Sequence, residues 1–287
     1  MSYPVSRDAR CRLSVSVVVP AYNAAATLPR ALRSVFEQTC QPAEVIVVDD
    51  ASSDQTWDML QQVCAEHPDQ PVRTLRLERN GGVASARNAG WAAASQEYIA
   101  FLDADDAWHP QKLELQHRWM LDHPRVVLCG HRCEIAGSSE LEAALPSDDI
   151  PARFFGLGSF LVANRISTPT VMLRRTLSER FASGKRYSED YLLWMQIVAA
   201  HGPAGFIDLP LAILFKARYG AAGLSGDLWG SHLGEIDTLS RLRGEGRIGF
   251  PVWMGTLVWS WMKFLKRVVF LKLFGSWLPR DVRNGSS

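Results

Sequence analysis

Short apolar runs alternate with segments of helical periodicity over the first hundred residues, and this alternation constrains the fold more than any other feature. Residues 13–19 (LSVSVVV) and 44–48 (EVIVV) are short and rich in β-branched side chains, as expected of strands buried on both faces. Residues 24–38 between them carry apolar side chains at the spacing of an amphipathic helix. Because such a helix is a crossover connection, the sheet is predicted to be mostly parallel and covered on both faces.

The same unit continues to residue 102. A helix from Asp54, strands at 72–77 and 98–102, and an alanine-rich helix at 83–94 are predicted. Open sheets of this kind bind ligands beyond the carboxyl ends of their strands. Polar residues follow those ends, at positions 20–23, 49–50, 80–82 and 103–106.

Beyond residue 126 the pattern is looser. Further strands are predicted at 126–129, 170–173, 206–207 and 211–215, and a helix at 191–200. The fold class expected is α/β, with a mostly parallel central mixed sheet flanked by helices and a helical, basic and aromatic C-terminal tail. The division expected along the chain is a polar extension at 1–12, a body at 13–225 with halves at 13–106 and 107–225, and a helical region at 226–287.

Charge and cysteine content restrict the partners and the compartment. The chain of 287 residues has 31 Lys or Arg and 30 Asp or Glu, and this balance gives no reason to expect nucleic acid as a partner. Five scattered cysteines favour a reducing cytosol over a disulfide scaffold. A metal cluster of Cys129, His131 and Cys133 lacks a second ligand pair at zinc-finger spacing. Residues 1–12 have no apolar core, so a signal peptide is not expected.

Three carboxylates follow the strand at 98–102 directly. Asp103, Asp105 and Asp106 stand in one turn, where their charges repel unless a cation or hydrogen-bond donors compensate them. Mg²⁺ or Mn²⁺, which prefer oxygen ligands, is the simplest compensation. The alternative is a solvated acidic turn that caps the helix near Pro110.

Four motifs occur in a fixed order, VSVVVPAYN (15–23), VIVVDDASSDQT (45–56), RNGGVASARNAG (79–90) and FLDADD (101–106). This set resembles the family 2 inverting nucleotide-sugar glycosyltransferases of the GT-A fold. The resemblance extends over about residues 13–225, and it is specific in the amino-terminal half. It implies a nucleotide diphosphate sugar, most often of uracil, as donor and Mn²⁺ or Mg²⁺ as cofactor.

The resemblance also implies which residues contact the donor. Pro20, Ala21 and Tyr22 would pack against the nucleoside, and Asp50 would hydrogen-bond the base. The other implied donor and metal residues are Gly82 for a tight backbone turn, Arg87 beside the diphosphate, Asp103 at the ribose and Asp105 at the metal. For Asp50 the alternative is a turn cap, and for Arg87 an ordinary surface arginine.

A second acidic pair stands at Glu189 and Asp190, where the family has its ED motif. The resemblance implies that Asp190 is the general base for an acceptor hydroxyl. Glu189 is a candidate for binding acceptor hydroxyls, and Trp194 is a candidate for lining the acceptor site, with a core position as the favoured alternative for this tryptophan. The alternative is that both carboxylates merely favour a helix amino terminus. Arg218 and Ser225 are weaker candidates for diphosphate contacts, since the segment lacks the histidine of relatives.

The C-terminal region differs from the body in charge. Residues 241–287 have nine Lys or Arg and two Asp or Glu, a local charge of +7. The apolar run at 250–262 is shorter than the ~20 residues of a membrane span. Aromatic side chains beside lysine and arginine are typical of a helix lying at a membrane surface. We expect such a helix, or one docked on the body or on a second subunit.

Together these features predict a cytoplasmic, metal-dependent inverting glycosyltransferase, peripheral at the inner face of the cell membrane. Its acceptor would be a hydroxyl of a glycan or lipid-linked molecule in cell-surface polysaccharide synthesis. A noncatalytic carbohydrate-binding or scaffold relative is one alternative. A sugar-nucleotide nucleotidyltransferase is another, but residues 21–26 lack the basic glycine-rich loop it would need.

Overall fold

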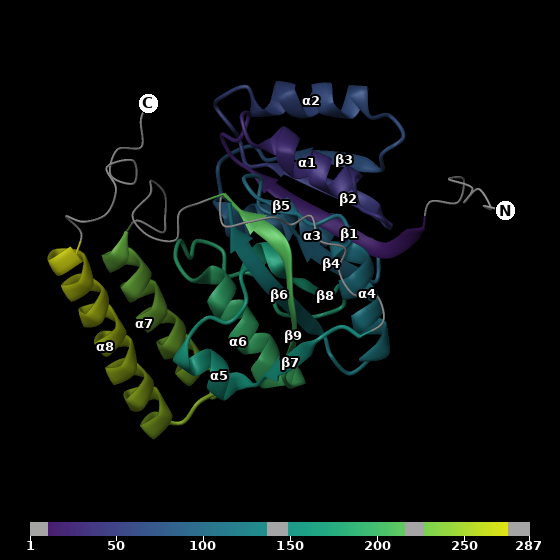
Figure 1. Ribbon diagram of the computed structural model, residues 1–287. Coiled ribbons are helices and arrows are strands. Elements are labelled where there is room, and N and C mark those ends of the chain that lie inside the picture. The colour runs from purple at the N-terminus through teal and green to yellow at the C-terminus, as the bar shows by residue number, and fades with distance from the viewer. Residues whose placement is uncertain (1–10, 137–148, 216–226, 275–287) are drawn as a thin grey trace.

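The computed structural model describes residues 11–136, 149–215 and 227–274, and it forms a central sheet with helices on both faces (Figure 1). The helices are α1 (Leu28–Phe36), α2 (Thr56–Glu66), α3 (Val83–Ala93), α4 (Lys112–Asp122), α5 (Leu157–Val162), α6 (Glu189–His201), α7 (Leu228–Gly244) and α8 (Phe250–Phe274), with a 3-10 turn η1 at Thr168–Thr170. The strands are β1 (Arg12–Ala21), β2 (Gln41–Asp49), β3 (Val72–Arg76), β4 (Tyr98–Phe101), β5 (Ala107–Trp108), β6 (Leu128–Ile135), β7 (Ala152–Phe155), β8 (Met172–Arg174) and β9 (Ala204–Leu214).

The sheet has the order β3-β2-β1-β4-β8-β6-β9-β5, with β7 paired to β9. The first four strands are parallel, as the alternating pattern predicts, because a helix connects each to the next. In the second half β8 is antiparallel to both β4 and β6, and β9 is parallel to β6. The predicted fold, a mixed sheet between helices, is therefore confirmed.

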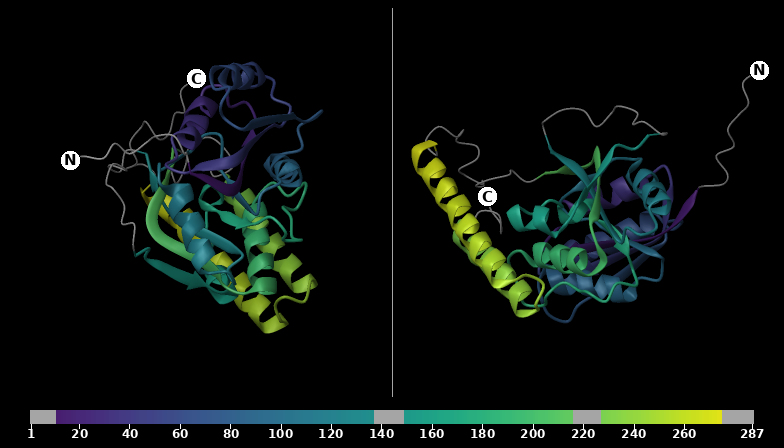
Figure 2. Two further views of the ribbon diagram at one scale, coloured as in Figure 1. Left: turned by 90° about the vertical axis from the view of Figure 1, so that its right-hand side faces the viewer. Right: turned by 90° about the horizontal axis from the view of Figure 1, so that it is seen from below.

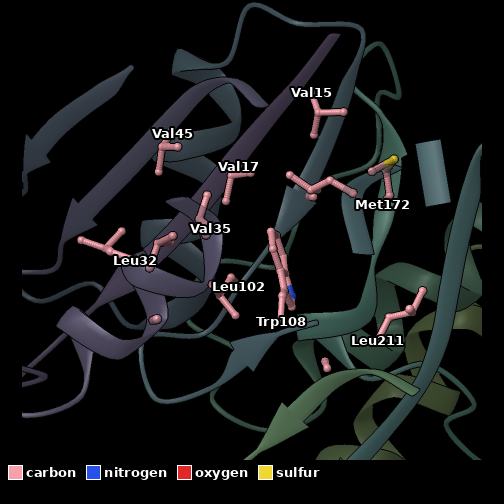
Figure 3. Close-up of a cluster of buried hydrophobic side chains, with 14 of the residues drawn as sticks. Val15, Val17, Leu32, Val35, Val45, Leu102, Trp108, Met172 and Leu211 are labelled. Carbon is pink, nitrogen blue, oxygen red and sulfur yellow. The ribbon is translucent and has the colours of Figure 1, made fainter. Parts of the chain in front are cut away.

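Two hydrophobic clusters, one on each face of the sheet, form the core. Successive side chains of β1 alternate between them, since Val17 belongs to the cluster with α1 and α4 whereas Val18 belongs to the cluster with α3 and α6. Figure 3 shows part of the first cluster, in which side chains of β1 (Val17), α1 (Leu32) and β5 (Trp108) are labelled. Burial of both faces explains why the strand sequences read as continuous apolar runs.

The second half departs from the sequence-based boundaries. The strands predicted at 206–207 and 211–215 are one strand, β9, because the chain stays extended through Pro210 and pairs with β6 across a register shift. The predicted helix at 191–200 begins two residues earlier, at Glu189. The predicted sites at Arg218 and Ser225 lie outside the described residues.

The two C-terminal helices pack beside the body, and α8 is outermost (Figure 2). Trp259 of α8 donates its indole N–H to the carbonyl of Val162, at 2.9 Å, and Ser260 is buried. Within the described residues, every helix is too short or too polar to cross a bilayer.

Candidate active site

The loops that follow β1 and β2 and the amino terminus of α3 enclose a first cavity of about 540 Å³. Each loop begins at the carboxyl end of a parallel strand, which is where sheets of this kind bind ligands. The cavity is lined by Pro20, Ala21, Tyr22, Asp50, Asn80, Gly81, Gly82, Val83, Ala84, Ala86, Gly184, Lys185 and Arg186. Five predicted nucleotide-binding residues, Pro20, Ala21, Tyr22, Asp50 and Gly82, are thus brought together.

Asp50 is one of the residues that line the first cavity. Its carboxylate is buried and accepts a hydrogen bond from the backbone N–H of Gly81, at 2.8 Å. Burial raises its pKa, although the N–H groups of Gly81 and Gly82 partly offset this effect. Gly82 has φ +81° at the start of α3, a conformation that suits glycine. Tyr22 is half exposed at the rim.

Arg87 follows Ala86, which lines this cavity, and its side chain connects two carboxylates. Its guanidinium donates to Asp103 at 2.7 Å and to Glu189 at 2.9 Å. Burial lowers the pKa of Arg87, but the charges of the two carboxylates outweigh burial and raise it above its ordinary value. The sequence predicts this arginine beside a diphosphate, and the structure places it between the two acidic motifs, with only 4% of its surface exposed.

The acidic turn after β4 offers a set of oxygen ligands. One carboxylate oxygen from each of Asp103, Asp105 and Asp106 lies within 4.8 Å of the others. Arg30 donates to the backbone carbonyl of Asp105 at 2.6 Å and so fixes the turn. Three hard oxygen donors at this spacing fit a divalent ion such as Mg²⁺ or Mn²⁺.

Glu189 and Asp190 form the first turn of α6. Burial and the neighbouring Asp190 raise the pKa of Glu189 to about 7, against the lowering effect of Arg87. Burial also raises the pKa of Asp190, whose carboxylate accepts bonds from Thr168 Oγ1 at 3.1 Å and from the N–H of Tyr191 at 2.6 Å. These bonds orient the Asp190 carboxylate.

Asp190 faces a second cavity, of about 390 Å³, rather than the first one. This second cavity is lined by His131, Arg132, Cys133, Asn164, Arg165, Ile166, Ser167, Asp190, Phe206 and Leu214. The linked side chains of Arg87, Asp103 and Glu189 therefore connect α3, whose start lines the first cavity, with the start of α6, where Asp190 lines the second.

Trp194 does not reach either cavity. It is fully buried, and its ring packs against that of Phe181 with the ring centroids 5.7 Å apart. The predicted acceptor contact by Trp194 is therefore corrected, because one turn along α6 from Asp190 the side chain points into the core.

Sequence reasoning missed the far wall of the first cavity. Lys185 and Arg186 line it, and Lys185 donates to Asp237 of α7 at 2.6 Å. A basic pair shortly before the acidic pair at 189–190 was the available signal, but it lies on a loop without periodicity.

Comparison with known proteins identifies the family of this chain. The model of the family "Glycosyl transferase family 2" matches residues 16–179, over half of the chain. This protein is a family 2 glycosyltransferase. The enzyme is 34% identical over 184 residues to the UDP-Glc:alpha-D-GlcNAc-diphosphoundecaprenol beta-1,3-glucosyltransferase WfgD of Escherichia coli. The aligned region covers 64% of this chain and 69% of WfgD. It is 43% identical over 108 residues to the putative teichuronic acid biosynthesis glycosyltransferase TuaG of Bacillus subtilis, over 38% of this chain and 42% of TuaG.

Solved structures share the fold of this glycosyltransferase. S. aureus TarS 1-349 in complex with UDP-GlcNAc has a TM-score of 0.66 at 20% identity, over 91% of this chain and 73% of that chain. The mannosyltransferase PcManGT from Pyrobaculum calidifontis, in complex with GDP-Man and Mn2+, has a TM-score of 0.62 at 20% identity, over 92% of this chain and 75% of that chain. This likeness confirms the predicted GT-A fold.

Proposed function

We propose that the enzyme transfers a sugar from a UDP-sugar to a hydroxyl group of a glycan or lipid-linked acceptor, with inversion and with Mn²⁺ or Mg²⁺ as cofactor. The observation that carries this proposal is the position of Asp190, which lines the second cavity, while its neighbour Glu189 bonds Arg87 of α3, the helix whose start lines the first cavity. Residues 13–106 are the proposed nucleotide-binding half, to whose cavity Lys185 and Arg186 also contribute, and residues 107–225 are the proposed acceptor half.

Asp190 acts as the general base in this proposal. Its carboxylate takes the proton of the acceptor hydroxyl while that oxygen attacks the anomeric carbon and the bond from this carbon to the diphosphate breaks. Attack from the side opposite the leaving group inverts the configuration, as in glycosidases with a base on the far face. A raised pKa makes Asp190 a stronger base than an exposed aspartate.

The ion pairs of Arg87 would fix the position of the donor site relative to the acceptor site. Arg87 holds Asp103 and Glu189 at fixed positions, so the acidic turn and the start of α6 cannot move apart. Asp105, with Asp103 and Asp106, would hold the divalent ion, which when bound stabilises the negative charge of the diphosphate. Pro20, Ala21, Tyr22 and Asp50 would bind the nucleoside.

The relatives support an acceptor in cell-surface polysaccharide synthesis. WfgD is described as acting on a diphosphoundecaprenol-linked sugar, and ExoO of Rhizobium meliloti, 34% identical over 201 residues, as a succinoglycan biosynthesis protein. For this chain we propose a location at the inner face of the cell membrane, with α8 as the contacting element. Exposed apolar side chains on α8 support this location, among them Met254, Val258, Met262, Leu265 and Val269.

Asp190→Asn tests the proposed function. We expect UDP to bind the variant as it binds the wild type, because Asp190 does not line the first cavity, and sugar transfer to fall by roughly a thousandfold. UDP binding is measured by calorimetry, and transfer by release of UDP in the presence of acceptor. Retained transfer would remove Asp190 from the mechanism. Absence of transfer in the wild type with every UDP-sugar would favour the noncatalytic alternative.

A further inference from the structure

Two arginines and a single carboxylate line the second cavity. Arg132 belongs to β6 and Arg165 follows α5, and both side chains are exposed, whereas the carboxylate is that of Asp190. His131 is buried, and burial holds its pKa well below the ordinary value, so it adds no charge. Even with Asp190 ionised, this lining has more positive than negative charge and attracts an anion.

The contacts of Arg165 orient its guanidinium. Its Nε donates to the carbonyl of Ser159 within α5, at 3.2 Å, and its central carbon lies 5.7 Å from the centre of the Phe155 ring. A guanidinium held in this way presents a planar set of donors that matches the oxygens of a phosphate. The cavity therefore has a cation on each of two separate elements.

An exposed apolar surface begins beside this cavity. Val162, three residues before Arg165, is 43% exposed, and its carbonyl accepts bonds from Trp259 and Lys263 of α8. Trp259 is itself 41% exposed, and Met262 on the next part of the helix is 55% exposed. A hydrocarbon chain that leaves the cavity past α5 thus meets apolar side chains along α8.

We infer that the second cavity binds an acceptor in which a phosphate or diphosphate joins the sugar to a hydrocarbon chain. The sugar hydroxyl lies at Asp190, the phosphate oxygens lie at Arg132 and Arg165, and the hydrocarbon passes Val162 toward α8. This inference rests on the proposed function, and it adds the two arginines as residues that determine acceptor specificity. An uncharged glycan would leave both guanidinium groups without an anionic partner from the substrate.

The test compares two amphiphiles that differ in head group. Binding of decyl diphosphate and of decyl maltoside, each as monomers, is measured by calorimetry on the full chain in EDTA. Without a divalent ion the carboxylates of Asp103, Asp105 and Asp106 repel an anion, and comparison of the variants shows whether decyl diphosphate binds in the second cavity or beside Lys185 and Arg186 in the first. The variants are Arg132→Gln and Arg165→Gln. Arg125→Gln, at an exposed arginine just before β6, matches their loss of charge.

We expect decyl diphosphate to bind roughly tenfold more tightly than decyl maltoside, and each cavity variant to weaken the diphosphate complex by roughly tenfold. Arg125→Gln is expected to bind as the wild type does. Equal affinity for the two amphiphiles, or tight diphosphate binding that survives in the double variant, would overturn the inference.

A second part of the experiment distinguishes a binding site for the acceptor from a binding site for a membrane phospholipid. Dihexanoyl phosphatidylglycerol, also monomeric, is added at the same concentration as decyl diphosphate. Retained binding of decyl diphosphate supports an acceptor site, whereas its displacement would assign the arginines to a lipid head group and overturn the inference. UDP binding with Mn²⁺ is measured on the same protein preparations after EDTA has been removed. Its absence would contradict the proposed function while leaving the decyl diphosphate result valid.

Discussion

At the scale of single residues, the buried guanidinium of Arg87 connects parts of the chain that are far apart in sequence. Asp103 lies 16 residues from it and Glu189 lies 102 residues from it. A buried charge that loses one partner costs about 3 to 5 kcal/mol, so the three side chains stabilise one another only as a set. The same set lies beside Asp190, and it therefore links folding to the geometry of the proposed base.

Glu189 makes the stability of the enzyme depend on pH. Its pKa is about 7 in the folded state against an ordinary value of 4.5, so the folded state binds more protons than the unfolded state between these values. Glu189 therefore contributes stability below pH 4.5 that is lost as pH rises through 7. Relative to Glu189→Gln, the wild type should lose on the order of 1 to 3 kcal/mol of unfolding free energy between pH 5 and pH 8.

Urea unfolding of both proteins at the two pH values measures this difference. Glu37→Gln, at an exposed position on the end of α1, controls for the loss of one negative charge. A difference between wild type and Glu189→Gln that stays constant with pH would contradict the raised pKa.

Asp105 is expected to be needed for metal-dependent nucleotide binding. With UDP and Mn²⁺ at about 100 times the dissociation constant, the wild type should gain about 2.7 kcal/mol of stability, seen as a rise in Tm. Asp105→Asn should lose this gain. Removal of one of three neighbouring negative charges also reduces their mutual repulsion in the variant without metal. Asp69→Asn, at an exposed loop position, should respond as the wild type does. An undiminished Mn²⁺ effect in Asp105→Asn would place the ion elsewhere.

At the scale of secondary structure elements, α3 packs on β1 at an unusually short distance. A Cβ atom added to Gly90 would lie 2.4 Å from Cγ1 of Val18, a stiff β-branched side chain in the middle of the sheet. Close approach here keeps the start of α3, which lines the first cavity, against the strand ends.

Gly90→Ala has two opposing effects on the free energy of unfolding. Alanine favours a helix over glycine by about 1 kcal/mol, whereas overpacking costs about 1 to 3 kcal/mol. We expect a net loss of roughly 1 kcal/mol in the free energy of unfolding, measured by urea denaturation. Gly255→Ala in α8 is the matched control, since nothing lies within 4 Å of its added Cβ, and it should be stabilising. Stabilisation by both substitutions would show that α3 can move away from β1.

The elements differ in how well the sequence predicts them. Strands β1, β2 and β4 are predictable because burial on both faces requires continuous apolar runs, which short exposed strands lack. The single strand β9 is predicted as two strands, because Pro210 interrupts the apolar pattern at a register shift that pairing with β6 accommodates.

The acidic residues of the site are predictable because they stand beside recognisable strands and helices. Lys185 and the second cavity depend on tertiary contacts between distant segments, which local patterns do not encode.

At the scale of the whole molecule, α8 presents an apolar face away from the body. Ser260 and Trp253 are directed to the body, whereas Val258, Met262 and Leu265 are each more than half exposed on another face. A face of this kind next to Lys266 suits the boundary between lipid head groups and acyl chains.

Polar substitution of this face should weaken membrane binding. In the triple variant Val258→Ser, Met262→Gln and Leu265→Gln, each change should cost roughly 1 kcal/mol of binding free energy, or roughly a hundredfold in the lipid affinity in total. Cosedimentation with vesicles that contain phosphatidylglycerol measures this affinity. Leu121→Gln, at an exposed leucine of α4, is the control. Unchanged sedimentation of the triple variant, or its conversion from dimer to monomer, would argue for a protein partner on α8.

The order of strands in the sheet has a consequence during translation. β8 fills the place between β4 and β6, yet it is synthesised some seventy residues after β4. A growing polypeptide that has left the ribosome only as far as α4 has the acidic turn but an open strand edge and no base at position 190. With Asp190 as the proposed base, turnover of sugar nucleotide is expected to start only when most of the protein has been made, and prematurely terminated products are expected to consume no donor.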